Sequence, residues 1–148
     1  MTQMNEEKIP PDGPVLTIDR EGSVRAMIIK GGRSTCNRRA FRRRYYDDID
    51  VYDKDGRWYK IRTARLVESS IWRKVAFLLF GARRVVDLDI EFQRRAGHEE
   101  IVKAVTDGLR KDEEFWSAGG DVDEMIEEMR AAKDVDGLLS VLNYFAKY

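Results

Sequence analysis

The pattern of apolar and polar positions changes its period near residue 97. Before that point, apolar and polar side chains alternate in short segments, a period of two that is typical of β-strands with one buried face. After it, apolar residues recur every three or four positions, as they do in amphipathic helices. Strands followed by helices are the order of an α+β domain. We therefore predict a mainly antiparallel sheet of about five strands in the N-terminal two-thirds, with a C-terminal layer of about three helices packed on one face.

A hairpin is predicted near the start of the chain. Two strands, residues 15–19 and 23–29, flank a short loop that contains Gly22. A pair of glycines ends the second strand, and residues 31–39 are predicted to form a polar, basic loop.

The three prolines all lie within residues 1–14, which are predicted to be a flexible tail. Residues 15–148 are predicted to form one domain, because a chain of 148 residues can bury a core but is short for two domains. The single cysteine excludes an intramolecular disulfide, so apolar packing has to stabilise that core.

The strongest local pattern predicts a second hairpin around Lys54, Asp55 and Gly56. We predict a three-residue loop with Gly56 in the left-handed conformation. In this register, apolar pairs and acid–base pairs occupy alternate rungs, whereas a loop shorter by one residue would set apolar against charged side chains. The predicted pairs are Asp53–Arg57, Tyr52–Trp58, Val51–Tyr59, Asp50–Lys60, Ile49–Ile61 and Asp48–Arg62.

A helix is predicted between Ser70, its N-cap, and Gly81, which ends it. We expect its apolar face to seal the core. The alternative is an interfacial helix, because the segment combines aromatic and basic side chains. The apolar face consists of Ile71, Trp72, Val75, Leu78 and Leu79, and the aromatic and basic residues are Trp72, Arg73, Lys74, Phe77 and Phe80.

Alternating residues at 83–93 predict a half-buried strand. If this strand is parallel to the preceding one, the helix before it is a crossover; if it is antiparallel, residues 69–82 are an excursion from a hairpin. The sequence leaves both arrangements open. Three amphipathic helices are then predicted over residues 98–116, 121–132 and 134–148, with Asp121 and Asp134 as N-caps.

The net charge of zero conceals a strong asymmetry. Residues 1–96 hold 21 Lys and Arg against 14 Asp and Glu, whereas residues 97–148 hold 6 against 13. Residues 30–44 hold seven basic residues and no acid. Charge asymmetry bears on association, and two interpretations are open. The basic segment either docks on acidic helical side chains of the same molecule, such as Glu99, Glu113 and Glu127, or meets a partner.

Candidate catalytic chemistry is sparse. Cys36 is the only cysteine and His98 the only histidine. Arg33, Arg38 and Arg39 lie near Cys36 in the sequence and would lower the pKa of its thiol, but only His98 could act as its base. One Cys and one His cannot build a Cys/His zinc site, and the acids of the second hairpin lack the spacing of a calcium loop. We therefore predict no catalytic residue, no metal site and no cofactor.

The N-terminus shows no apolar signal segment. The longest apolar run, residues 75–82, is shorter than the roughly 20 residues that a spanning helix needs. We expect a cytoplasmic protein without a membrane span.

The arginine-rich segment, residues 38–44, is the main candidate for function. Arginine makes bidentate contacts with carboxylates and phosphates, and exposed Tyr and Trp often dominate interfaces. We expect a small, non-enzymatic, bacterial-type binding protein that contacts a protein partner, for example an inhibitor or immunity-type protein. The alternatives are a nucleic-acid-binding protein and an enzyme of unidentified type, and the charge asymmetry also allows self-association into a homo-oligomer. The predicted partner-binding residues are Arg38, Arg39, Arg42, Arg43, Arg44, Tyr46, Tyr52 and Trp58.

Overall fold

The computed structural model describes residues 11–117 and 120–145 and confirms the predicted α+β class. The strands are β1 (Gly13–Ile18), β2 (Val24–Ile29), β3 (Arg33–Cys36), β4 (Ile49–Tyr52), β5 (Arg57–Leu66) and β6 (Arg84–Arg95). The helices are α1 (Arg38–Arg42), α2 (Ile71–Leu79), α3 (His98–Lys111), α4 (Glu113–Ser117), α5 (Val122–Ala131) and α6 (Val135–Phe145).

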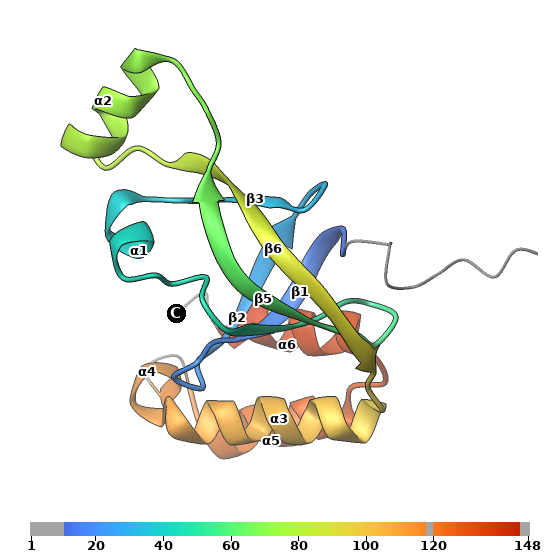
Figure 1. The fold of residues 1–148 in the computed structure, drawn as a ribbon. Coiled ribbons are helices and arrows are strands. Elements are labelled where there is room, and N and C mark those ends of the chain that lie inside the picture. Colours follow the sequence, from blue (N-terminus) through green and yellow to red (C-terminus); the bar gives the residue numbers. More distant parts are fainter. Residues whose placement is uncertain (1–10, 118–119, 146–148) are drawn as a thin grey trace, which may run out of the picture.

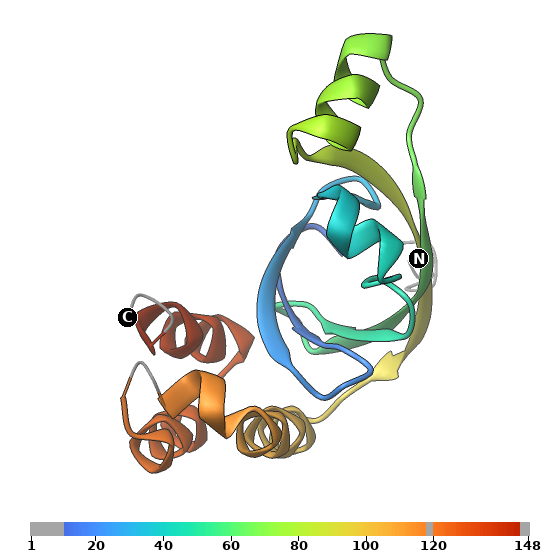
Figure 2. The same cartoon turned by 90° about the vertical axis from the view of Figure 1, so that its left-hand side faces the viewer.

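The strands form one six-stranded antiparallel sheet in the order β2-β1-β4-β5-β6-β3. The sheet is strongly curved, and a bridge between Lys30 and Arg33 joins the end of β2 to the start of β3. The curved sheet is therefore nearly a barrel, which Figure 2 shows close to end-on. Helices α3, α5 and α6 lie together along one side of it, and α2 stands away from it at the opposite end (Figure 1).

The main difference from the predicted fold lies in the segment before β4. A polar, basic loop was expected at residues 31–39, but the chain forms β3 there and begins α1 at Arg38. Strand β3 pairs with β6 and buries Cys36, and the side chain of Asn37 caps α1 by accepting a bond from the amide of Ala40 at 2.8 Å. The arginine-rich segment, residues 38–44, therefore begins as α1 and continues into the turn that leads to β4.

The start of the chain also differs slightly from the prediction. Strand β1 begins at Gly13, two residues inside the predicted tail, because Gly13 and Pro14 pair with Ile29 and Ile28 of β2. Residues 1–10 of that tail lie outside the described residues.

The β4–β5 hairpin has the predicted register. Gly56 is left-handed with φ of 82°, and the amide of Asp53 donates to the carbonyl of Arg57 at 3.1 Å. The ladder pairs Ile49 with Ile61, as expected. The predicted Asp48–Arg62 pair is wrong, because the ladder stops at Ile49. Asp48 is itself left-handed, and Arg62 bonds to Glu91 of β6 instead.

The sheet separates two apolar cores. Inside the barrel lie Val15, Ile29, Cys36, Tyr46, Ile49, Val51, Tyr59, Ile61 and Val86. Between the barrel and the helical layer, Leu16, Val24 and Tyr52 pack against the apolar faces of α3, α4, α5 and α6. Successive residues of β1, Val15 and Leu16, therefore enter different cores, and both faces of this strand are covered.

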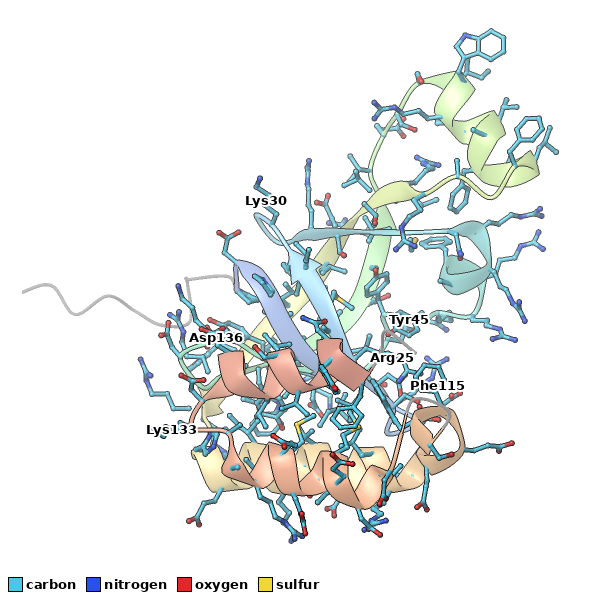
Figure 3. The ribbon with its side chains drawn as sticks, turned by 180° about the vertical axis from the view of Figure 1, so that it is seen from behind. Arg25, Lys30, Tyr45, Phe115, Lys133 and Asp136 are labelled. Atoms are coloured by element: carbon cyan, nitrogen blue, oxygen red, sulfur yellow. The ribbon has the colours of Figure 1, made fainter. Side chains whose placement is uncertain are left out.

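The predicted helical layer is confirmed. Asp121 caps α5 by accepting from the amide of Asp123, and Asp134 caps α6 by accepting from the amide of Gly137. Helix α4 adds a short turn that buries Trp116. Arg25 of β2 ties this layer to the sheet: its guanidinium lies 4.4 Å from the ring centroid of Phe115 and 3.2 Å from a carboxylate oxygen of Asp112 (Figure 3).

The open question about residues 83–93 is settled as antiparallel. Strands β5 and β6 pair as far as Leu66 and Val86, and the amide of Val67 donates to Val85 at 3.1 Å. Helix α2 is thus an excursion from the end of a hairpin. Its predicted ends are confirmed, since Ser70 caps it and the chain leaves it through left-handed Gly81.

Gly108 provides a test of how the helical layer packs on the sheet. A Cβ at this position of α3 would lie 2.4 Å from Cγ2 of Val24 and 2.7 Å from the carbonyl oxygen of Gly22. We predict that Gly108→Ala lowers the free energy of unfolding by about 1–3 kcal/mol in urea denaturation, because overpacking outweighs alanine's higher helix propensity. Asp107→Ala, at the exposed neighbouring position, should change it by less than about 0.5 kcal/mol. A Gly108→Ala variant as stable as the parent would contradict this packing.

Candidate binding surface on α1 and α2

Helix α2 presents most of its apolar side chains to solvent. Trp72 is 79% exposed and Phe80, just after the helix, is 78% exposed, while Phe77 is the buried residue of α2. Ile71, Leu78 and Leu79 are also exposed. The prediction that this face seals the core is wrong. The β5–β6 ladder continues to the end of the sheet, so the helix that connects the two strands lies beyond that end.

Helix α2 is held to the barrel by its opposite side. The ring of Phe77 meets the edge of Phe41 of α1 at a centroid distance of 6.5 Å, and the guanidinium of Arg84 lies 5.6 Å from the Phe77 centroid. Arg38 of α1 donates to the carbonyl oxygen of Leu78 at 3.0 Å. Helices α1 and α2 therefore form one unit at this end of the molecule.

The arginines of α1 are exposed beside this apolar face. The side chains of Arg39, Arg42 and Arg43 make no ion pair or hydrogen bond with any residue that the structure describes. Arg44 pairs with Asp47 at 2.7 Å, and Arg20 fixes the segment by donating to the carbonyls of Arg43 and Arg44.

The first interpretation of the basic segment, docking on acidic side chains of the helical layer, is wrong for the arginines of α1. Among the described residues, none of the α1 arginines pairs with a carboxylate of the helical layer; Glu113 bonds to Arg110 instead. The ion pairs between sheet and layer are made elsewhere, by Arg25 with Asp112 and by Arg94 with Glu100. The positive charge of α1 therefore faces solvent.

A groove of about 390 Å³ separates α1 from α2. Its walls combine guanidinium groups with an apolar floor, and its lining includes no carboxylate. The lining residues are Asn37, Arg38, Arg39, Arg42, Arg43, Phe77, Leu78 and Gly81. We call this groove, with the exposed apolar side chains of α2 and Phe80, the α1–α2 surface.

The three aromatic residues predicted to bind a partner do not belong to this surface. Tyr46 is buried inside the barrel, where its hydroxyl donates to the carbonyl of Thr35 at 2.6 Å. Tyr52 is buried under the helical layer, and burial, with the charge of Asp50, raises its pKa to about 12. The prediction that they lie on the surface is wrong, because the turn before β4 places Tyr46 in the barrel and the helical layer covers Tyr52 of β4.

Trp58 lies where the sheet meets the helical layer. Its indole nitrogen donates to Asp50 at 3.0 Å, and the guanidinium of Arg94 lies 5.1 Å from its ring centroid. The arginines of this surface were predicted from the sequence, whereas its apolar half was not. The available signal was the aromatic and basic composition of residues 71–80, which the core-sealing interpretation set aside.

Cys36 and His98 occupy different parts of the molecule. Cys36 lies in the barrel core, and burial raises the pKa of its thiol despite the opposing charges of Arg83 and Arg84. The expected lowering by Arg33, Arg38 and Arg39 is therefore wrong. The Nε2 of His98 lies 2.7 Å from the carbonyl oxygen of Ala132 in the helical layer.

Comparisons of the chain with protein-family models, curated proteins and solved structures found no match. Within residues 11–117 and 120–145, no three His, Cys, Asp or Glu side chains gather as metal ligands would. The described part of the chain contains no helix of the length and apolar character required to traverse a bilayer.

The environment of Cys36 makes a direct prediction about its reactivity. The thiol is buried and its pKa is raised, so little accessible thiolate exists near neutral pH. We expect an aromatic disulfide reagent to label the native protein at pH 7.5 at least about 100-fold more slowly than the urea-unfolded chain. Labelling of the native protein as fast as of the unfolded chain would show that Cys36 is accessible.

Proposed function

We propose that this chain is a non-enzymatic binding protein and that α2 docks into an apolar, acid-rimmed groove of a protein partner. The observation that carries the proposal is the exposed apolar face of α2 next to arginines that no described carboxylate neutralises. A helix that lays an apolar face into a partner's groove is a common mode of protein recognition.

The positions on α2 fit that mode. Ile71, Trp72, Leu78 and Leu79 repeat at the spacing of one helical face, and Phe80 extends the face at the C-terminal end. Burial of such side chains contributes about 1.5–3 kcal/mol each, before the entropic cost of association is subtracted. Because these side chains are exposed in the isolated chain, their burial energy is still available for a partner.

The arginines of α1 supply charge selectivity. A cluster of exposed positive charges attracts a negatively charged partner surface and raises the rate of association. Salt screens this effect. Arg39, Arg42 and Arg43 are the arginines best placed for this, since their guanidinium groups have no partner in the described part of the chain. The favoured partner surface therefore carries carboxylates around an apolar centre.

Nucleic acid and an anionic lipid surface are the competing ligands. The arginines alone would suit the phosphates of a nucleic acid. An exposed row of apolar side chains adds nothing to phosphate binding, so α2 favours a protein groove over nucleic acid. An anionic bilayer would accept both the apolar and the basic residues. These ligands are therefore separate outcomes of the test.

The double variant Trp72→Ala/Phe80→Ala should abolish partner binding without destabilising the fold. Proteins captured from lysate after nuclease treatment are identified and purified, and their affinity is measured by calorimetry. We expect at least about a 100-fold loss for the double variant, since truncation of each interface anchor costs about 2 kcal/mol or more. The matched control Ile28→Ala, at an exposed apolar residue of β2, should bind like the parent.

The triple variant Arg39→Ala/Arg42→Ala/Arg43→Ala separates the charge contribution. It should weaken partner binding about 10-fold or more at low salt and much less at high salt.

Loss of the captured ligand on nuclease treatment would replace the proposal with nucleic-acid binding. Sedimentation with phosphatidylserine vesicles that depends on Trp72 and Phe80 would replace it with lipid binding. A purified partner that binds both variants at parental affinity would also overturn it.

A further inference from the structure

A second concavity lies beside α2, where this helix meets β3 and the start of β6. Its volume is about 340 Å³, within the size range of small-molecule sites. Four arginines come together here from α2, β3 and the segment entering β6. The lining residues are Arg33, Thr35, Val67, Glu68, Ser69, Arg73, Ala76, Ala82, Arg83, Arg84 and Val85. We call it the arginine cavity.

Two of these arginines are held in place by neutral oxygens. Arg83 donates from Nε to the hydroxyl and from Nη2 to the carbonyl oxygen of Thr35, both at 2.9 Å. Arg84 donates from Nη2 to the carbonyl oxygen of Val67 at 2.7 Å. Neutral acceptors orient a guanidinium group without cancelling its charge, so both groups keep their full positive charge and a fixed geometry.

The carboxylates near the cavity do not neutralise it. The side chain of Glu68 is 95% exposed and pairs with Lys74 at 3.4 Å, and Asp87 pairs with Arg33 at 2.6 Å. No ion pair joins Arg73, Arg83 or Arg84 to any carboxylate of the described ranges. Three guanidinium groups therefore line one concavity without an ion-pair partner among the described residues.

Two buried polar atoms of the lining residues also lack hydrogen-bond partners. They are the hydroxyl oxygen of Ser69 and Nε of Arg84. Buried polar atoms are nearly always satisfied in folded proteins, and an exception often marks the place of a bound water or ion. Both groups can donate a hydrogen bond, so an acceptor that reaches them would satisfy both.

From the uncompensated arginines and the unpaired donors, we infer that the arginine cavity binds a phosphomonoester dianion. Such a group carries a charge between −1.5 and −2 at pH 7 and three strong acceptor oxygens. Arg73, Arg83 and Arg84 supply donors to those oxygens, and Ser69 supplies a hydroxyl. The volume leaves room for part of the organic group beyond the phosphate. The phosphate belongs either to a free metabolite-sized ester or to a phosphorylated side chain of another protein; the chemistry of recognition is the same.

Calorimetry with phenyl phosphate and with a short phosphoserine peptide tests this inference. We expect at least one of them to bind with a submillimolar Kd at pH 7.5, and the tighter of the two identifies the source of the phosphate. Affinity should fall below pH 6, as the dianion takes up a proton. Diethyl phosphate, with a single negative charge, should bind at least about 10-fold more weakly.

Variants assign the binding to this cavity. Arg73→Gln should weaken it roughly 10- to 100-fold, and Ser69→Ala several-fold, the range expected for hydrogen bonds to a charged group. Neither should lower the thermal midpoint, because Arg73 is exposed and the Ser69 hydroxyl has no partner to lose. Arg62→Gln, at an exposed arginine of β5 outside the cavity, is the matched control.

The outcomes also separate this inference from the proposed function. Trp72→Ala/Phe80→Ala should bind the phosphate probes like the parent, whatever it does to the protein partner. The inference is overturned if neither phosphate probe binds, if diethyl phosphate binds as tightly, or if Arg73→Gln and Ser69→Ala bind like Arg62→Gln.

Discussion

The antiparallel ladder between β5 and β6 determines where α2 lies, and both proposed sites include residues of this helix. Because the ladder runs to the pair Leu66–Val86, the intervening chain has to leave and re-enter the sheet at one end. Helix α2 therefore has no sheet beneath it, and Phe77 alone among its residues is buried. Ile71, Trp72 and Leu79 are at least 70% exposed and contribute little burial energy to folding, so the fold does not require them to be apolar. Their exposure is the observation that motivates the proposed docking of α2 on a partner.

Charge follows the same division of the molecule. The net charge is zero, yet α1 and α2 lie at one end and the acidic helices α3 and α5 at the other (Figure 1). The described ion pairs that involve carboxylates of the helical layer and arginines of the sheet, such as Arg25–Asp112, lie where sheet and helical layer touch. At the far end, Arg39, Arg42 and Arg43 are beyond the reach of those carboxylates, and solvent screens their attraction. The positive potential of that end is therefore directed outward.

The sequence predicted correctly those elements whose positions were fixed by two independent constraints. The β4–β5 register follows from turn geometry and from alternating pairs such as Ile49–Ile61 and Asp50–Lys60, which agree. Strand β3 was not predicted, because it pairs with β6, which is distant in the sequence. Helix α1 was not predicted, because its arginines leave no helical repeat of apolar residues. Tyr52 of β4 was misplaced because alternation shows only that a strand has two faces. It does not show that a barrel core covers one and helices the other.

Phe77 connects the two candidate sites. Its ring packs against Phe41 of α1 on the side of the α1–α2 groove, and the guanidinium of Arg84 from the arginine cavity lies over it. A phosphate bound in the cavity would compete with the Phe77 ring for the charge of Arg84, and Phe77 is the side chain that anchors α2. Thermodynamic linkage then requires reciprocity. If a bound anion changes the affinity for the partner by some factor, the bound partner changes the affinity for the anion by the same factor. An exposed helix with one buried anchor is well suited to such coupling, because few contacts oppose a small shift of the whole element.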